Sequence, residues 1–308
     1  GSWPHNRVEQ HNYADYQYDI YGRTTQKIMH NQRWLYRYDS EHRLVEALHQ
    51  PSSRTLPQCV VSFSYDPLGR RTRKRVRYQQ MESVTESLKK YVPTETRFLW
   101  EGSRLLAEFN GDRTQVYAYS DQNSYAPLAR IDGTGDNSQL YYFHNRLNGQ
   151  PEAMTDSEGN ERWRGKPDGW GKVKGETPER EIKSGGPQNL RMQGQYLDRE
   201  TGLHYNLHRY YDPDSGRFTQ HDPIGLAGGL NLYQYAPNSL GWIDPLGLCK
   251  KSVDTPYGAA NQSNSLPALA ARKKVENGSI LYRIGTTGKS ETTGAQFWAL
   301  EHPSSIGY

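Results

Sequence analysis

The sequence has few aliphatic residues for its length. Hydrophobic residues make up 34% of the 308 positions and the mean hydropathy is −0.97, so two ordinary hydrophobic cores and an α-helical bundle are excluded. A disordered chain could share that hydropathy, but 23 Tyr, 7 Trp and 6 Phe are the opposite of a disordered composition. Tyrosine packs a ring and keeps a hydroxyl for a polar partner, which favours broad β-sheets with partly wet faces.

Cysteine, long apolar runs and net charge are also scarce. With only Cys59 and Cys249, we expect no disulfide framework, no metal site and synthesis in a reducing compartment. No apolar run approaches the ~18–20 residues that span a bilayer. The start at Gly1 lacks a signal-peptide pattern, which predicts a soluble fragment. A formal charge of +4 gives no strong signal for nucleic-acid binding.

The dipeptide Tyr-Asp recurs along the chain. It ends alternating runs that are typical of strands, such as residues 34–38 and 60–65, and at Asp19 and Asp66 it opens Asp-x-x-Gly strings that are typical of type I turns. One such hairpin cannot bury its apolar face alone, so the units are expected to join in a continuous sheet. The dipeptides are Tyr18-Asp19, Tyr38-Asp39, Tyr65-Asp66 and Tyr211-Asp212.

These units resemble the Rhs, or YD, repeats of bacterial polymorphic toxins over residues 1–248. The clearest part, residues 216–248, is similar to the Rhs-associated core. The resemblance implies an all-β fold, a YD-repeat β-sheet ribbon forming part of a hollow cocoon, followed by a small α+β toxin fragment. We divide the chain into a shell over 1–215, the core over 216–248 and a toxin beginning over 249–308. Because family cocoons are several times longer, the front of the shell is expected to be absent.

Two Asp-Pro-x-Gly strings in the core are the strongest candidates for chemistry. They begin at Asp222 and Asp244, and paired carboxylates can share a proton while one activates water and the other polarises a peptide carbonyl. The string is also a good turn, and Asp66 opens the same string inside an ordinary repeat. The pattern alone favours the turn. The resemblance instead implies autoproteolysis, without a cofactor, between Leu248 and Cys249.

Two neighbouring residues leave alternatives open. Arg217 either tunes the aspartate pair or is a turn arginine on the surface. Cys249 could attack the preceding carbonyl itself. We rank that mechanism below the aspartate pair, because no histidine is near Cys249 in sequence and only His221 could approach it in space. A small buried cysteine is the simplest interpretation.

Three stretches depart from the repeat pattern. The basic run at residues 70–77 predicts a solvated strand face or sheet edge rather than a phosphate site. Residues 160–188 are rich in Gly, Pro and charge, which indicates a long loop or an excursion of the sheet. Residues 266–275 form the one convincing short helix, beyond the predicted domain boundary after Leu248.

The last segment resembles the opening of NAD-dependent ADP-ribosyltransferase toxins. Two strand-like runs there could hold NAD through arginine–phosphate and ring-stacking contacts. Those enzymes need a later glutamate, and the last acidic residue here is Glu301, so the transferase is expected to be incomplete. The alternative is that these are ordinary strand residues of an unfinished domain. The candidate NAD-binding residues are Arg283, Gly285, Thr286, Phe297 and Trp298.

The sequence therefore predicts an Rhs effector that encloses and autoproteolytically releases a C-terminal antibacterial toxin. The resemblance implies a cognate immunity protein, a chaperone and a secretion apparatus such as type VI. It also implies synthesis in the bacterial cytoplasm and contact-dependent delivery into a neighbouring cell. Two other functions remain open. One is a non-catalytic encapsulation shell, and the other is a YD-repeat protein that binds carbohydrates or surfaces through exposed Tyr and Trp.

Overall fold

The computed structural model describes residues 4–53, 56–79, 92–178, 187–248 and 250, and the backbone of five short strands between Lys251 and Ala299. The chain divides into two compact units, residues 1–253 and 254–308. No helix among the described residues has the length and apolar character needed to cross a membrane. The described helical segments are the short 3-10 turns η1 (Pro4–Asn6), η3 (Gly135–Asn137) and η5 (Gly225–Gly228).

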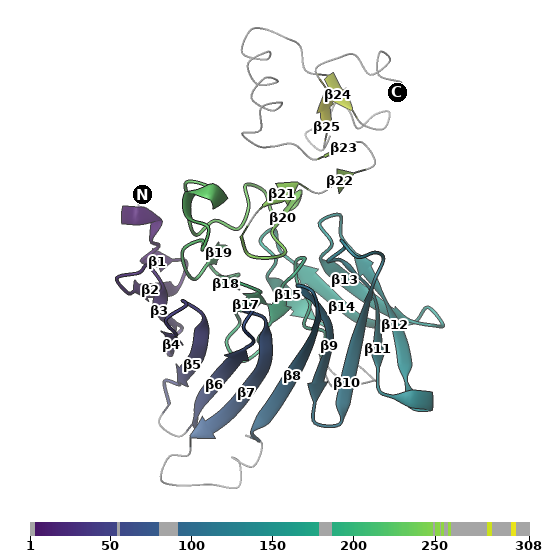
Figure 1. Ribbon diagram of the computed structural model, residues 1–308, viewed down its shortest axis with the longest axis horizontal. Helices are drawn as coiled ribbons and strands as arrows, with labels where there is room; N and C mark the ends of the chain where they lie inside the picture. Colours follow the sequence, from purple (N-terminus) through teal and green to yellow (C-terminus); the bar gives the residue numbers. More distant parts are fainter. Residues whose placement is uncertain are drawn as a thin grey trace. The chain divides into compact units, whose positions relative to one another are not determined.

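The first unit is built on one antiparallel sheet of 15 strands (Figure 1). Each strand pairs with the strands before and after it in sequence, so the sheet is a continuous meander. The large β-sheet ribbon and the all-β class predicted for the shell are thus confirmed. The strands are β1 (Gln10–His11), β2 (Ala14–Tyr18), β3 (Thr24–Met29), β4 (Gln32–Tyr38), β5 (Leu44–Gln50), β6 (Gln58–Tyr65), β7 (Arg71–Gln79), β8 (Thr94–Glu101), β9 (Arg104–Asn110), β10 (Arg113–Tyr119), β11 (Pro127–Asp132), β12 (Gln139–Asn145), β13 (Pro151–Asp156), β14 (Glu161–Pro167) and β15 (Val173–Glu176).

The aspartates of the first three Tyr-Asp dipeptides close their own turns. The Oδ1 atom of Asp66 accepts hydrogen bonds from the backbone N–H groups of Leu68 and Arg70, both at 2.9 Å. Its Oδ2 atom accepts from the Nε of Arg70 at 2.7 Å. Gly69 takes the left-handed conformation, with φ of 80°, that ends the turn. Asp19 and Asp39 make the same set of contacts.

Tyrosines of the repeats tie neighbouring strands together. The hydroxyl of Tyr38 donates to the carbonyl of Thr24 at 2.9 Å, and that of Tyr65 donates to the carbonyl of Leu44 at 2.5 Å. The ring covers apolar surface while the hydroxyl satisfies a backbone acceptor. This double use explains how a sheet so poor in aliphatic residues is stabilised.

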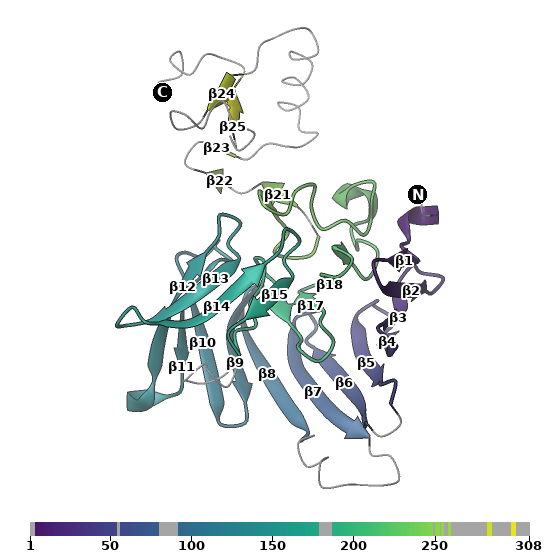
Figure 2. The ribbon, with the colours of Figure 1, turned by 180° about the vertical axis from the view of Figure 1, so that it is seen from behind.

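A second, smaller sheet packs against one face of the meander, where both views show it beside the curved strands (Figure 2). The main core joins Val61 and Phe63 of the large sheet to Leu203, Tyr205 and Tyr210 of the small one. Long-range packing of this kind fixes the segment that carries the candidate site. The small sheet contains β16 (Tyr196–Leu197), β17 (His204–Asn206), β18 (Arg209–Asp212) and β19 (Arg217–Phe218).

Of the two predictions for residues 160–188, a long loop is wrong and an excursion of the sheet is confirmed by residues 161–176. They form β14 and β15, which pair with each other and extend the large sheet. Gly165 does not break its strand. A Cβ there would lie 2.6 Å from the indole of Trp163, so the glycine makes room for that buried ring. Residues 179–186 lie outside the described part of the chain.

The basic run at residues 70–77 is only partly solvated, which corrects a second prediction. Arg71 and Lys74 point into the core, where Arg71 Nη1 lies 2.6 Å from Asp198 Oδ2 and Lys74 Nζ lies 2.8 Å from Glu200 Oε2. The more exposed Arg73 and Arg75 pair with Glu95 on the opposite face, as predicted for a solvated face.

The remaining short strands are described only through their backbones. In the first unit, β20 (Trp242–Ile243) pairs with β21 (Lys251–Ser252), so this unit continues past the predicted boundary after Leu248. The second unit contains β22 (Asp254–Thr255), β23 (Gly258–Ala259), β24 (Tyr282–Ile284) and β25 (Phe297–Ala299). The predicted helix over 266–275 lies outside the described residues.

Candidate active site

Asp222 and Asp244 meet at a single buried arginine, Arg209. Nη2 of Arg209 lies 2.9 Å from Oδ2 of Asp222 and 3.4 Å from Oδ2 of Asp244. The side chains of Asp222 and Asp244 are 2% and 0% exposed, and that of Arg209 is 0% exposed. The fold thus brings together two carboxylates that are 22 positions apart in the sequence.

Local turn geometry aims both carboxylates at Arg209. Oδ1 of Asp222 accepts from the N–H of Ile224 at 3.2 Å, and Oδ1 of Asp244 accepts from the N–H of Leu248 at 2.9 Å. In the first three repeats the residue four places after the aspartate is an arginine that binds Oδ2. Here those positions are Leu226 and Leu248, so each Oδ2 atom is left for a partner from elsewhere in the chain.

Arg209 is itself held rigidly on β18. Its Nε donates to the carbonyl of Gly247 at 2.6 Å, and its Nη1 donates to the carbonyl of Leu232 at 3.0 Å. The guanidinium carbon lies 3.6 Å from the centre of the Phe218 ring, a cation–π arrangement. Because most donors of this arginine are occupied, it positions the two aspartates instead of rotating freely.

Burial dominates the electrostatics of the site. It raises the pKa of the Asp244 carboxyl above its ordinary value, and the neighbouring Asp222 raises that pKa further while Arg209 opposes both. Burial also lowers the pKa of Arg209 to about 10, against the two carboxylates that favour its charged form. The site therefore favours the protonated form of Asp244 more than an exposed position would.

The carbonyl of Leu248 lies beside this pair. A Cβ added to Gly228 would be 2.2 Å from Oδ2 of Asp222 and 3.3 Å from the carbonyl oxygen of Leu248. The same bare glycine therefore contacts a carboxylate and the carbonyl that precedes residue 249. Gly228 ends η5 and belongs to the Gly228-Gly229 loop that the sequence places between the two strings.

Other predicted residues lie elsewhere or outside the description. Arg217 donates to the carbonyl of Asn6 at 2.5 Å and to Oδ1 of Asn231 at 3.2 Å, so the arginine that reaches the aspartates is Arg209 and not Arg217. His221 packs against Tyr233, with ring centres 4.8 Å apart. Cys249 lies outside the described residues, so its predicted roles at the scissile bond or as a nucleophile are not tested.

The predicted NAD-binding residues lie in the second unit. Backbone pairing places Arg283 on β24 opposite Trp298 on β25, with Phe297 beside it on the same strand. Gly285, Thr286 and Glu301 lie outside the described residues. Among the residues that the structure describes, no group of three or more His, Cys, Asp or Glu side chains is placed to hold a metal.

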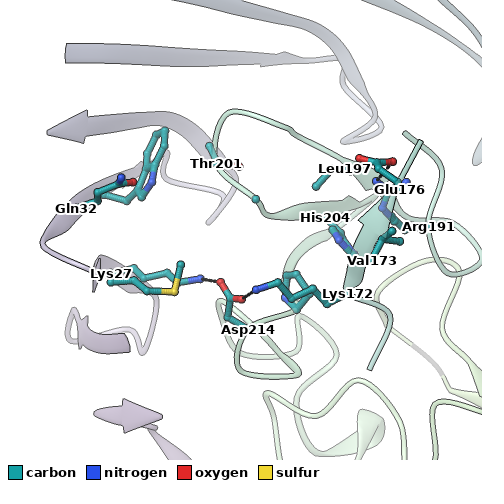
Figure 3. A pocket seen from close by; sticks show the side chains of 14 residues that line it. Lys27, Gln32, Lys172, Val173, Glu176, Arg191, Leu197, Thr201, His204 and Asp214 are labelled. Carbon is teal, nitrogen blue, oxygen red and sulfur yellow. Dashed lines mark hydrogen bonds and ion pairs between the residues drawn. The ribbon is translucent and has the colours of Figure 1, made fainter. Parts of the chain in front are cut away.

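A separate cavity of about 230 Å³ is lined by residues of the large sheet and of the segment that packs on it (Figure 3). Figure 3 shows Lys27 and Lys172 both directed at Asp214. Nζ of Lys27 lies 2.6 Å from Oδ2 of Asp214 and 2.8 Å from Oδ1 of Asp212, the aspartate of the fourth Tyr-Asp dipeptide. The charges of these groups offset one another, and the ion pairs of Lys27 join β18 and the turn after it to β3 of the large sheet. This is a structural role.

Comparison with known proteins shows similarity to Rhs proteins. A model described as RHS protein matches residues 140–177. The double-stranded DNA deaminase toxin A of Burkholderia cenocepacia is 37% identical over 262 residues, 79% of this chain and 17% of that protein. The probable deoxyribonuclease RhsA of Dickeya dadantii is 32% identical over 288 residues, which cover 90% of this chain and 18% of that protein.

The toxin protein Tse5 of Pseudomonas aeruginosa is 32% identical over 278 residues, covering 80% of this chain and 20% of that protein. The chain thus spans a fifth or less of the length of these curated relatives. Among solved structures, the TcdB2-TccC3-Cdc42 complex aligns with 76% of this chain and 17% of the matched chain, at 20% identity and a TM-score of 0.36. The chain is thus similar to Rhs proteins over most of its length.

Proposed function

We propose that this chain is the closing part of an Rhs effector shell that encloses a C-terminal toxin and cuts its own backbone between Leu248 and Cys249. The observation that carries the proposal is the buried pair of Asp222 and Asp244, bridged by Arg209, next to the carbonyl of Leu248. A buried pair of carboxylates is costly to stability. A role in activating water would explain why the pair is present despite this cost.

The proposed reaction is hydrolysis of one peptide bond. In the proposed mechanism the pair shares one proton, and the raised pKa of Asp244 favours this carboxyl group as its holder. The ionised carboxylate takes a proton from water as the water oxygen attacks the carbonyl carbon of Leu248, and the protonated carboxyl group donates to the carbonyl oxygen. The C–N bond then breaks, its nitrogen takes up a proton, and the products are a Leu248 carboxyl group and a Cys249 amine.

The experiment that tests this proposal is a time course of intact mass on the purified chain at several protein concentrations. We expect fragments of residues 1–248 and 249–308, formed at a rate that does not depend on concentration, because the reaction is intramolecular. Cys249→Ala should be cut at the wild-type rate, whereas an uncut variant would favour the cysteine nucleophile. A wild-type chain that stays intact would favour a non-catalytic shell.

The partners follow from the same proposal. A shell that encloses a toxin requires an immunity protein in the producing cell, and delivery requires a secretion apparatus with its chaperone. We propose synthesis in the bacterial cytoplasm and contact-dependent transfer into a neighbouring cell. Co-purification of the chain with the product of an adjacent gene that neutralises its toxicity would test the first of these partners.

For the segment 249–308 we propose the beginning of an NAD-dependent ADP-ribosyltransferase. The antiparallel pairing of β24 and β25, which sets Arg283 opposite Trp298, supports this proposal. Guanidinium groups bind phosphates through two parallel hydrogen bonds that lysine cannot reproduce. NAD would supply the ADP-ribose group that is transferred, and Arg283 would bind its phosphates.

A chain extended beyond Tyr308 should therefore transfer label from NAD, and its Arg283→Lys variant should not. Two relatives are named a DNA deaminase and a deoxyribonuclease. If the extended chain damages DNA without consuming NAD, the transferase assignment is wrong and the shell assignment stands.

A further inference from the structure

The lysine that follows residue 249 is anchored to the same loop that contacts Asp222. Nζ of Lys250 donates to the carbonyl of Gly228 at 2.8 Å and lies 3.5 Å from Oε1 of Gln234. A Cβ added to Gly229 would lie 3.3 Å from the ammonium nitrogen, so this second glycine also leaves room for it. The side chain of Lys250 is thus held by the Gly228 carbonyl and the Gln234 side chain, and the bare glycine at 229 leaves room for it.

The backbone beyond Lys250 is anchored as well. Lys251 pairs with Ile243 and Ser252 pairs with Trp242, so β21 lies along the strand that leads directly into Asp244. On the other side, the N–H of Leu248 donates to Oδ1 of Asp244 at 2.9 Å. Leu248 and Lys250, the described residues on either side of position 249, are therefore both anchored, and both anchors are built from the segment that carries the aspartates.

We propose that Lys250 is a positioning residue for self-cleavage, whose ammonium group holds the chain after the scissile bond against the Gly228-Gly229 loop. This inference rests on the proposed autoproteolysis and adds a specificity to it. The enclosed toxin would carry its own recognition determinant, a long cationic side chain at its second position. The shell would then cut efficiently only cargo that begins with this determinant.

The electrostatics show that the position of Lys250 is held by its contacts, at a cost to its charge. Burial lowers the pKa of Lys250, and Arg209 lowers it further, while Asp222 and Asp244 oppose both. The two carboxylates offset only part of that cost. The hydrogen bond to the Gly228 carbonyl at 2.8 Å is therefore the observation on which the positioning role rests.

The test uses the full chain with two substitutions of similar length. Lys250→Met keeps the length and removes the charge, and Lys250→Arg keeps a charged donor. Rates are measured by pulse-labelled cell-free synthesis, because cleavage then begins from an uncut chain. A small misplacement of reacting groups can cost about 100-fold in rate, so we expect Met to slow cleavage roughly 10- to 100-fold and Arg to restore much of it. Lys166→Ala, which removes an exposed lysine far from the site in sequence, should cleave like the wild type.

A structural role for Lys250 is tested separately in the uncut Asp222→Asn background. There, Lys250→Met should leave the melting temperature unchanged, because positioning affects the reaction and not the fold. If Lys250→Met cleaves at the wild-type rate while Asp222→Asn does not, the role of Lys250 is refuted and the aspartate mechanism stands. If Asp222→Asn itself cleaves at the wild-type rate, both proposals fail.

Discussion

The string Asp-Pro-Leu-Gly occurs at Asp66 and at Asp244, and the two aspartates have opposite environments. In the repeat, both oxygens of Asp66 are occupied within the turn, since Arg70 donates through its backbone and its guanidinium. Burial acts against it, but these hydrogen bonds lower the pKa of Asp66 below its ordinary value. At Asp244, burial raises the pKa instead. One string therefore gives a stable anion and the other a carboxyl group that can hold a proton.

The difference depends on the residue four places after each aspartate. Arg23, Arg43 and Arg70 close the repeat turns from within. Leu226 and Leu248 occupy the equivalent positions in the core, so Asp222 and Asp244 must take a partner from β18. The comparison teaches that a leucine at this position releases a turn aspartate for long-range contacts.

The largest expected effect on stability comes from removing the shared arginine. Arg209→Gln leaves two buried carboxylates without their cation, which should cost about 3–5 kcal/mol in the free energy of unfolding and abolish cleavage. Arg70→Gln removes the arginine of a partly exposed turn and should cost less than about 1 kcal/mol. Urea denaturation of both variants measures the contrast, and equal losses would contradict it.

Filling the space at Gly228 should have the next largest effect. In Gly228→Ala, the new methyl group would meet Oδ2 of Asp222 at 2.2 Å, so the carboxylate must move away from Arg209 and the Leu248 carbonyl. Overpacking of this kind costs about 1–3 kcal/mol in the free energy of unfolding. The activation free energy of cleavage should rise by at least the same amount. Gly175→Ala is the matched control, because open space surrounds a Cβ there and cleavage should be unchanged. Equal cleavage rates in the two variants would show that Gly228 does not border the site.

The two kinds of turn should also respond differently to pH. Because burial raises the folded-state pKa of Asp244, the stability this carboxyl provides is complete below its unfolded-state pKa and is lost as pH rises through the folded value. Cleavage should fall along the same limb, up to tenfold per pH unit, because the proton on the pair is lost. For Asp66, whose pKa is lowered, stability should be lost only as pH falls. A cleavage rate that rises steadily with pH would contradict the shared proton.

The smallest effect is expected in the repeat itself. Asp66→Ala weakens one turn and should cost about 0.5–2 kcal/mol, by analogy with the loss of a helix cap. The rest of the meander keeps its pairing, so cleavage should continue at the wild-type rate. Thermal denaturation and intact mass on the same sample separate the two outcomes. A loss of cleavage here would mean that turn stability, and not position, controls the reaction.

Much of the fold follows from local patterns in the sequence. Alternation and the Tyr-Asp turns predict the meander, because both act within a single hairpin. The ion pairs of Arg71 and Lys74 could not be predicted, since their partners Asp198 and Glu200 are more than a hundred residues away and a bulge near Tyr65 changes which side chains face inward. The bounds of strands β14 and β15 could not be predicted from the sequence, because the glycine and proline residues between positions 161 and 176 are typical of loops.

The candidate site was predicted in part. The sequence indicates Asp222 and Asp244 but points to Arg217, which is nearer to Asp222 in the core segment, instead of Arg209. Spacing cannot identify Arg209, because it belongs to a strand of the second sheet whose packing depends on distant residues. One signal was available. The two core strings lack the arginine that the repeat turns contain, which implies that a cation must come from another element.

The most direct test compares the two kinds of aspartate in one assay. Purified wild type, Asp222→Asn, Asp244→Asn and Asp66→Asn are followed by intact mass under identical conditions. We predict that the wild type and Asp66→Asn are cleaved after Leu248 at the same rate. The two core variants should slow at least about 100-fold, because an amide cannot exchange the proton. Cleavage of either core variant at the wild-type rate, or an equal block in Asp66→Asn, would contradict the account.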